Sequence, residues 1–184
     1  RGFYKTKKFK DPVYLGDPIN ILKIFNDKEV DEICVLDIGA TPSGDGPQLD
    51  YLGEFASECF VPMAYGGGIT KMEQVREIFR IGIEKCVINS AYHVEPSLIK
   101  NAAAEYGSQS VVVSIDVKKK MFGGYEVLSS SGTKKTGRNP GDLAREAEDI
   151  GAGEILLNAI DRDGTMDGYD LELAEEVPPS QVRH

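Results

Sequence analysis

Short apolar runs recur along this chain, and their repetition constrains its fold more than any other feature. The runs cover residues 33–36, 61–65, 85–88, 110–115 and 154–157. The segments between them carry helix signals. Asp17-Pro18 and Asn139-Pro140 each place a capping side chain before a proline, and Thr70 with Glu73 forms the pattern of a capping box. Strands that alternate with helices predict a parallel sheet, because parallel neighbours need crossover connections.

Polar residues or glycines follow every one of these runs. They are Asp37, Gly66-Gly67-Gly68, Asn89-Ser90, Asp116 and residues 161–165. A doubly wound sheet gathers its ligand contacts at one switch point, whereas a barrel carries functional residues at the carboxyl end of every strand. The pattern therefore favours an α/β fold of the (β/α)8 class, the TIM barrel. Residues 118–137 interrupt the alternation, and we expect a long loop with a small hairpin there, over the barrel mouth.

The length of the chain limits how much of a barrel it can form. A complete barrel takes roughly 250 residues, and this chain has 184. We expect a single partial domain over residues 1–184, with strands two to six, the tail of strand one at residues 3–6, and a sixth helix from about 170 to 177. Nothing after Pro178-Pro179 resembles strands seven and eight. Either the sequence is part of a longer chain or a second chain completes the barrel.

The composition of the chain argues against several classes of binding partner. The net charge is −9 and the pI is about 4.8, which argues against nucleic acid, because phosphate backbones are bound by surplus Lys and Arg. No apolar run reaches transmembrane length. Three widely spaced cysteines are typical of reduced thiols, and two histidines give no zinc pattern. A calcium loop that starts at Asp161 or at Asp163 lacks required ligands in either register. We expect a cytoplasmic protein that binds no membrane, no metal and no cofactor.

Two neighbouring strand ends predict a phosphate site. The triplet Gly66-Gly67-Gly68 lets the backbone approach an anion closely, and Asn89 and Ser90 at the next strand end supply an amide and a hydroxyl. A tight turn from strand to helix explains a glycine triplet equally well. Both interpretations stay open.

Two aspartates are candidates for proton transfer. Asp116 ends the apolar run 111–115, where burial raises the pKa of a carboxyl group toward the range of a general acid or base. A helix cap or an ion pair with Lys118 is the alternative interpretation. Asp163 is expected to face Asp116 from strand six, with Gly164 and Thr165 donating to a second phosphate.

Taken together, the motifs resemble a known family over nearly the whole chain. The likeness is carried by Gly16-Asp17-Pro18, 31–32 with 36–38, 66–69, 85–90, 107–109, 114–116, Ser131-Gly132 and 151–168. Gly-Ala-Gly-Glu-Ile-Leu-Leu followed by Ile-Asp-Arg-Asp-Gly-Thr is the most specific of these motifs. The chain is similar to the cyclase subunit of imidazole glycerol phosphate synthase. This resemblance implies a (β/α)8 barrel that takes ammonia from a glutaminase partner and combines it with a small bisphosphorylated aminoimidazole ribonucleotide. The implied products are imidazole glycerol phosphate, for histidine synthesis, and an aminoimidazole carboxamide ribotide.

The resemblance also implies roles for individual residues. Asp116 matches one of two catalytic aspartates, the other of which would precede Arg1. The residues that match substrate or phosphate contacts are Lys5, Gly68, Asn89, Ser90, Asp163 and Gly164, while Ser131 and Gly132 match a mobile loop. Charged residues that gate ammonia at the barrel floor are matched by Glu32, Lys85 and Glu154.

Departures from the family pattern keep alternative functions open. Gly39 lies where these cyclases usually have threonine, and Asn158 replaces another threonine before the Asp-Arg-Asp motif. With residues 9–20, these features resemble cyclase-like paralogues of surface-polysaccharide (lipopolysaccharide) biosynthesis, which pass ammonia to a sugar amidotransferase. A third hypothesis is a non-catalytic, phosphate-binding scaffold for the glutaminase.

Overall fold

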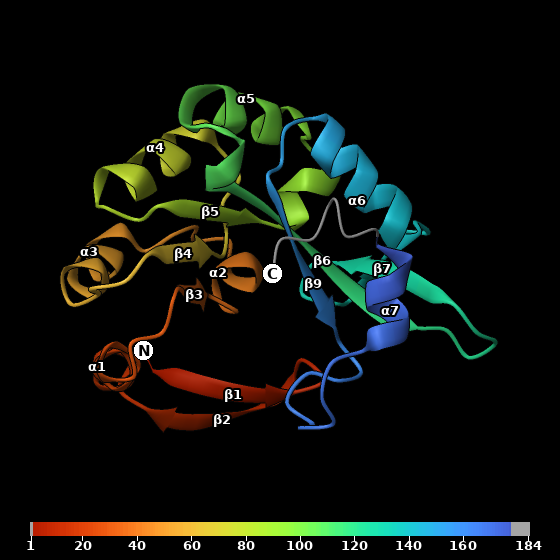
Figure 1. Ribbon diagram of the computed structural model, residues 1–184, viewed down its shortest axis with the longest axis horizontal. Helices are drawn as coiled ribbons and strands as arrows, with labels where there is room; N and C mark the ends of the chain where they lie inside the picture. The colour runs from red at the N-terminus through yellow and green to blue at the C-terminus, as the bar shows by residue number, and fades with distance from the viewer. Residues whose placement is uncertain (1, 178–184) are drawn as a thin grey trace.

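A curled sheet with helices along its outer side forms the frame of the molecule (Figure 1). The computed structural model describes residues 2–177. Five parallel strands pair in the order β3 (Ile33–Leu36), β4 (Met63–Gly66), β5 (Lys85–Ile88), β6 (Val111–Lys119) and β9 (Glu154–Ala159). The helices that connect them are α3 (Leu49–Ser57), α4 (Met72–Arg80), α5 (Ser97–Tyr106) and α6 (Pro140–Asp149).

The α/β class is confirmed, and the curled half-barrel is consistent with a TIM-barrel family. Two of the predicted strands, 33–36 and 85–88, have the observed bounds, and the others shift by a few residues at their ends. Within residues 2–177, no strand joins the free edge of β3 to that of β9. The remaining elements are α1 (Pro18–Asp27), α2 (Ala40–Ser43), α7 (Leu171–Glu176) and the short 3-10 turns η1 (Ser90–His93) and η2 (Ser108–Ser110).

Residues 3–6 are not the tail of the first barrel strand, as the sequence suggested. They belong to β1 (Phe3–Lys7), which pairs antiparallel with β2 (Lys10–Gly16) in a separate two-stranded sheet. The two strands are joined by two residues, and so short a connection permits only an antiparallel hairpin. Tyr4 and Tyr14 stabilise the pairing, with their rings edge to face at 5.6 Å.

The predicted loop over residues 118–137 does contain a hairpin. The end of β6 pairs antiparallel with β7 (Tyr125–Ser129), which in turn pairs with β8 (Lys134–Lys135). The tip of the hairpin carries Met121 and Phe122, both almost fully exposed.

Helix starts follow the local sequence signals with one exception. The Asp17 carboxylate accepts from the backbone N–H groups of Ile19 and Asn20, and Asn139 caps α6 in the same way. The predicted capping box of Thr70 and Glu73 is wrong. Helix α4 begins one residue later than expected, so Gln74 takes the third helical position and accepts from the N–H groups of Thr70 and Lys71.

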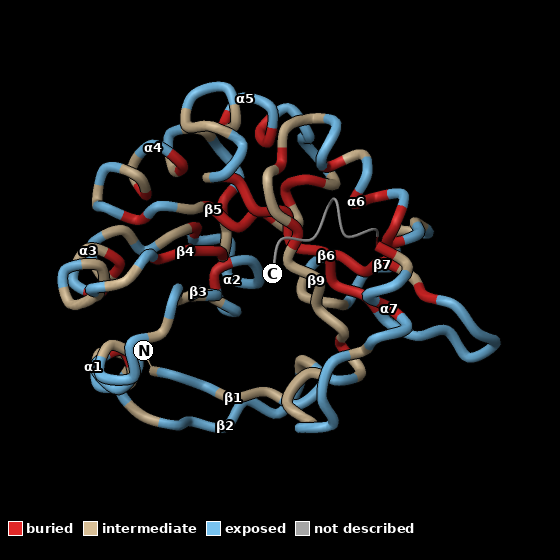
Figure 2. The backbone as a smooth tube through the Cα atoms, in the orientation of Figure 1, coloured by how far each residue is buried: buried red, intermediate tan, exposed pale blue. Residues whose placement is uncertain are grey.

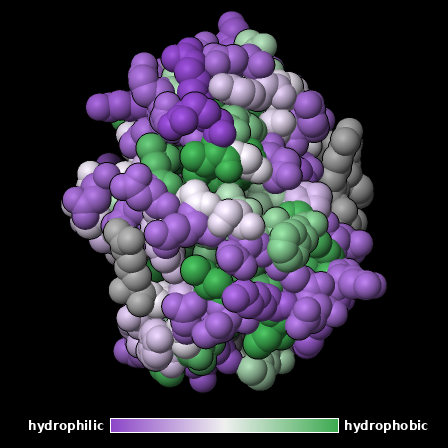
Figure 3. All heavy atoms as spheres, turned by 90° about the vertical axis from the view of Figure 1, so that its left-hand side faces the viewer, coloured by the Kyte–Doolittle hydropathy of each residue, from purple (hydrophilic) through white to green (hydrophobic). Residues whose placement is uncertain are grey.

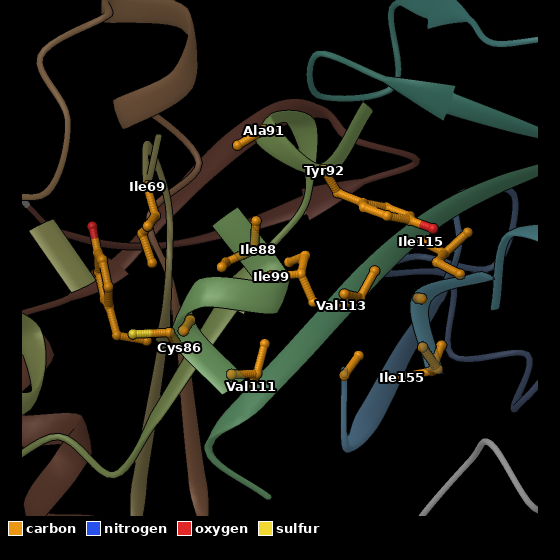
Figure 4. Close-up of a cluster of buried hydrophobic side chains, with 14 of the residues drawn as sticks. Ile69, Cys86, Ile88, Ala91, Tyr92, Ile99, Val111, Val113, Ile115 and Ile155 are labelled. Atoms are coloured by element: carbon orange, nitrogen blue, oxygen red, sulfur yellow. The ribbon is translucent and has the colours of Figure 1, made fainter. Parts of the chain in front are cut away.

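One apolar core lies between the sheet and its helices. The buried residues follow β4, β5, β6 and the inward faces of the helices (Figure 2). Ile99 of α5 lies close to Ile88 and Val113 in this core (Figure 4). Some large apolar side chains, including Leu36 on the free edge of β3, remain exposed. On the face at the left of Figure 1, apolar side chains gather among hydrophilic ones (Figure 3). No helix of residues 2–177 is long and apolar enough to cross a membrane.

Ile99→Ala should lower the free energy of unfolding by about 2–5 kcal/mol, because it removes fully buried methyl groups and leaves a cavity. Ile24→Ala is the matched control, since Ile24 lies on α1 and is 52% exposed; its effect should stay within about 0.5 kcal/mol. Denaturant unfolding measures both. Equal losses would contradict the placement of the core.

Candidate active site

A cleft of about 860 Å³ lies at the carboxyl ends of the parallel strands. Each strand contributes a polar or glycine residue to its wall: Asp37, Gly67, Asn89, Asp116 and Asn158, in the spatial order of the strands. They converge because parallel strands present their carboxyl ends at the same edge of a sheet. The cleft therefore joins residues that are far apart in the sequence, as the strand-end pattern predicts.

Asp116 is the most deeply buried acid of the cleft, with 5% of its surface exposed. Its Oδ1 accepts a hydrogen bond from Asn158 Nδ2 at 3.0 Å. Burial raises the pKa of Asp116, although hydrogen bonds from Asn158 and Asn89 act in the opposite direction. Asp116 neither caps a helix nor pairs with Lys118, because its hydrogen-bond partner is the side-chain amide of Asn158. A carboxyl group with a raised pKa is suited to proton transfer.

The glycine triplet is required by close packing as well as by its place in the cleft. A Cβ atom on Gly67 would lie 2.6 Å from Asp37 Cβ and 2.7 Å from its carbonyl oxygen, and one on Gly68 would lie 2.9 Å from Gly46 Cα. Both glycines have positive φ. The tight-turn interpretation is thus supported, and the same backbone still lines the cleft.

Asn89 and Ser90 lie in the cleft wall next to the glycines. Asn89 Nδ2 donates to Ser114 Oγ at 3.4 Å, and Ser90 Oγ donates to Asn89 Oδ1 at 3.3 Å. Ser90 also accepts from the Ser130 N–H at 3.2 Å and so ties the loop after β7 to the cleft. Ser131 of this loop lines the cleft, whereas the predicted Gly132 does not. A Cβ on Gly132 would instead lie 3.2 Å from the Phe9 ring.

Asp163 lines the same cleft as Asp116, but its carboxylate is already engaged. It accepts from Thr6 Oγ1 at 2.9 Å and from the Phe9 N–H at 3.1 Å, and so holds the β1–β2 hairpin against the cleft. Thr6 and Phe9 line the cleft with it. That Asp163 faces Asp116 stays a prediction, and its contacts with Thr6 and Phe9 were not foreseen from the sequence.

Three predicted phosphate or substrate residues lie outside the cleft wall: Lys5, Gly164 and Thr165. A Cβ on Gly164 would lie 2.0 Å from the Thr6 carbonyl oxygen, so this glycine packs beneath the hairpin. Thr165 Oγ1 donates to the Arg162 carbonyl within its own turn. Both residues have contacts within or beneath their own loop, and their role at a second phosphate stays a prediction.

Several polar residues of the cleft were given no site role from the sequence, among them Ser114 and Asp37, which was noted only as a strand end. Asp37 lines the cleft, and its Oδ1 accepts from the N–H groups of Gly39 and Ala40 at 2.9 and 3.0 Å. Its place directly after a strand was the same signal that pointed to Asp116. Ser114 lies two residues before Asp116 and so faces the same side of β6, which strand alternation could have shown.

The three predicted gate residues meet at the opposite end of the strands. Lys85 Nζ lies 2.7 Å from Glu32 Oε2 and 2.8 Å from Glu154 Oε1. Lys85 and Glu154 begin β5 and β9, and Glu32 directly precedes β3. Burial lowers the pKa of Lys85, but the hydrogen bonds to Glu154 and Glu32 outweigh it, so the net shift is upward. Among residues 2–177, no group of three or more His, Cys, Asp or Glu could hold a metal ion.

The curled βα sheet, with a buried carboxyl group and a glycine-lined wall at its strand ends, defines a barrel-type small-molecule site. Residues 2–181 match the family model of the histidine biosynthesis proteins. The chain belongs to this family.

Three relatives illustrate the likeness. A Pseudomonas aeruginosa protein, provisionally named imidazole glycerol phosphate synthase subunit hisF2, is 49% identical over 96% of this chain and 70% of its own length. A Leptospira interrogans protein with a provisional HisF name is 48% identical over 95% of the chain and 69% of its own length. Imidazole glycerol phosphate synthase subunit HisF of Alkaliphilus metalliredigens is 42% identical over 94% of the chain and 69% of its own length. The resemblance seen in the motifs is confirmed.

Gly67→Ala should destabilise the protein more than Gly44→Ala. Both glycines have positive φ, which costs a residue with a Cβ about 1–2 kcal/mol. Only at Gly67 does the added atom also meet backbone, and overpacking adds about 1–3 kcal/mol. Comparing the free energies of unfolding of the two variants checks this, and equal values would argue against the close approach of Gly67 to Asp37.

Proposed function

We propose that this chain is an ammonia-dependent cyclase, a lyase of histidine biosynthesis. It combines ammonia with a bisphosphorylated aminoimidazole ribonucleotide and releases imidazole glycerol phosphate and an aminoimidazole carboxamide ribotide. The observation that carries the proposal is the buried carboxyl group of Asp116 in a cleft walled by Gly67, Gly68 and Asn89. Relatives named imidazole glycerol phosphate synthase subunit HisF, at 42–44% identity, support it.

In this proposal each wall of the cleft has its own task. The backbone around Gly67 and Gly68, with the side chains of Asn89 and Ser90, binds one phosphate group, because glycines let N–H groups approach the anion closely. Asp116 exchanges a proton with the substrate as the new ring forms, and burial brings its pKa closer to neutrality for that step. The position of the family's second catalytic aspartate would align before Arg1, outside the sequence given.

Ammonia is proposed to enter from the other end of the strands. Lys85, Glu32 and Glu154 form a charged cluster there, and a glutaminase subunit docked on this face would release ammonia next to it. Opening the Lys85 ion pairs would admit ammonia toward the cleft. The same cluster explains why the partner should bind at the amino ends of the strands.

The second candidate is a cyclase-like paralogue that passes ammonia to a sugar amidotransferase. Two observations favour it. Three provisionally named relatives are 47–49% identical to the chain over at least 95% of its length and a fourth is 44% identical over 94%, whereas relatives named simply HisF are 42–44% identical. In addition, Asn158, which contacts Asp116, replaces the threonine that is usual in the histidine-pathway cyclases. Binding of the ribonucleotide without turnover would favour this candidate.

The proposed cyclase should consume the ribonucleotide with ammonium salts alone. Asp116→Asn should lower that turnover by about 10²–10⁴-fold, because it removes the group that exchanges the proton. Absorbance of the substrate and chromatography of the two products measure it. Parent-like turnover by the variant would remove Asp116 from the mechanism.

The stability of the same variant serves as its control. Because burial raises the pKa of Asp116 above its value in the unfolded chain, the protonated form stabilises the fold at low pH. This stabilisation is lost as the pH rises through the folded-state pKa. Asp116→Asn should therefore be at least as stable as the parent at pH 7. Lost turnover in a variant that stays folded then reports on chemistry.

Lys85→Met should reduce turnover driven by glutamine and the glutaminase, while turnover driven by ammonium salts is retained. The variant leaves Glu32 and Glu154 facing each other without their cation, which disrupts the proposed gate and not the cleft. Lys23→Met is the matched control, because Lys23 pairs with Glu58 on the outer surface. An equal loss with both nitrogen sources would contradict a gating role.

A further inference from the structure

Asn158 of β9 joins two side chains of β6 in a hydrogen-bonded group that also includes Asn89, the residue after β5. Its Nδ2 donates to Asp116 Oδ1 at 3.0 Å and to Ser114 Oγ at 3.1 Å, and Asn89 Nδ2 approaches the same Ser114 Oγ at 3.4 Å. The register of β9 against β6 places Asn158 directly opposite Asp116. Pairing of the backbone therefore brings the amide and the carboxylate to neighbouring positions of the sheet, where the hydrogen bond forms.

The orientation of the Asn158 amide follows from its partner. An ionised carboxylate accepts hydrogen bonds and donates none, so the amide must turn its nitrogen toward Asp116. The Asn158 Oδ1 then receives no hydrogen bond from residues 2–177. It is nevertheless not a buried atom, because His93 Nε2 is the one buried side-chain N or O atom in that range without a partner. The Oδ1 atom is therefore reachable from the cleft that Asn158 lines.

We propose that Asn158 is a positioning residue that holds the Asp116 carboxylate in one orientation and in its deprotonated form. Its nitrogen opposes the effect of burial, which favours the neutral acid. Its fixed rotamer also aims the second carboxylate oxygen of Asp116. The catalytic use of this contact rests on the proposed function, whereas the contact itself does not.

The charged side chains of the cleft do not shift the pKa of Asp116. The ionisable side chains that line the same cleft are Asp37, Asp45, Lys71 and Asp163. None of them contributes to the shift in the pKa of Asp116, which is set by burial and by the amides of Asn158 and Asn89. The two residues that pair with Asp116 in the sheet, Leu128 of β7 and Asn158 of β9, are both uncharged, as is Asn89 after β5.

The test is a titration of Asp116 followed by carboxyl ¹³C NMR, with the Asp116→Asn spectrum used for assignment. Asn158→Leu keeps the size of the side chain and removes the donor, so the midpoint should rise by about one pH unit, a tenfold change in proton affinity. Asn158→Asp, a polar variant of the same shape, should raise it further through like-charge repulsion. Asn101→Leu and Asn101→Asp are the matched controls on the exposed face of α5, and they should leave the midpoint unchanged.

Turnover separates the two proposals. In Asn158→Leu, the acidic limb of the pH profile of kcat/KM should move up with the NMR midpoint. An unchanged midpoint in both Asn158 variants overturns the positioning role, whatever the turnover. A shifted midpoint in a protein whose parent never consumes the ribonucleotide supports the positioning role and rejects only the proposed cyclase.

Discussion

The parallel pairing of β6 between β5 and β9 is the constraint on which the candidate site depends. A strand with neighbours on both sides buries its side chains, and β6 continues past Asp116 to pair with β7. Asp116 lies three residues beyond Val113, the last residue that pairs with β5, and is buried between Asn158 of β9 and Leu128 of β7. The same pairing brings Asn158 opposite Asp116 and Asn89 within reach of Ser114. The polarity of the cleft floor is a consequence of sheet register.

The buried position that suits Asp116 for proton transfer also lowers the stability of the fold. An ionised carboxylate in a buried position costs free energy, and the amide of Asn158 returns only part of it. The surrounding apolar core of β6, with Val113 and Ile115 fully buried, supplies the stability that tolerates this cost. At the other end of the strands, Lys85 forms ion pairs with both Glu32 and Glu154, so each carboxylate has a cationic partner while the cluster keeps one net negative charge.

Much of this organisation could be read from the sequence, and the reasons are local. Apolar runs with helix caps between them predict strands and their order, and the carboxyl ends of parallel strands must meet, which placed Asp116, Asn89 and Gly67 together. The partners of individual side chains could not be read in this way. Asp163 binds the β1–β2 hairpin because residues 3–7 pair with residues 10–16. That pairing was not predicted from the sequence, since residues 3–6 were assigned to a barrel strand. Likewise, the one-residue shift in the start of α4 exchanged Glu73 for Gln74 as the capping side chain.

The contact between Thr6 and Asp163 joins residues 157 positions apart. Closing a loop between two such residues costs conformational entropy, and that cost falls once the strands between its two ends have assembled. The contact can break without unfolding them, since the hairpin shares no strand pairing with the main sheet. Access to the cleft from this side is thereby separated from the stability of the core.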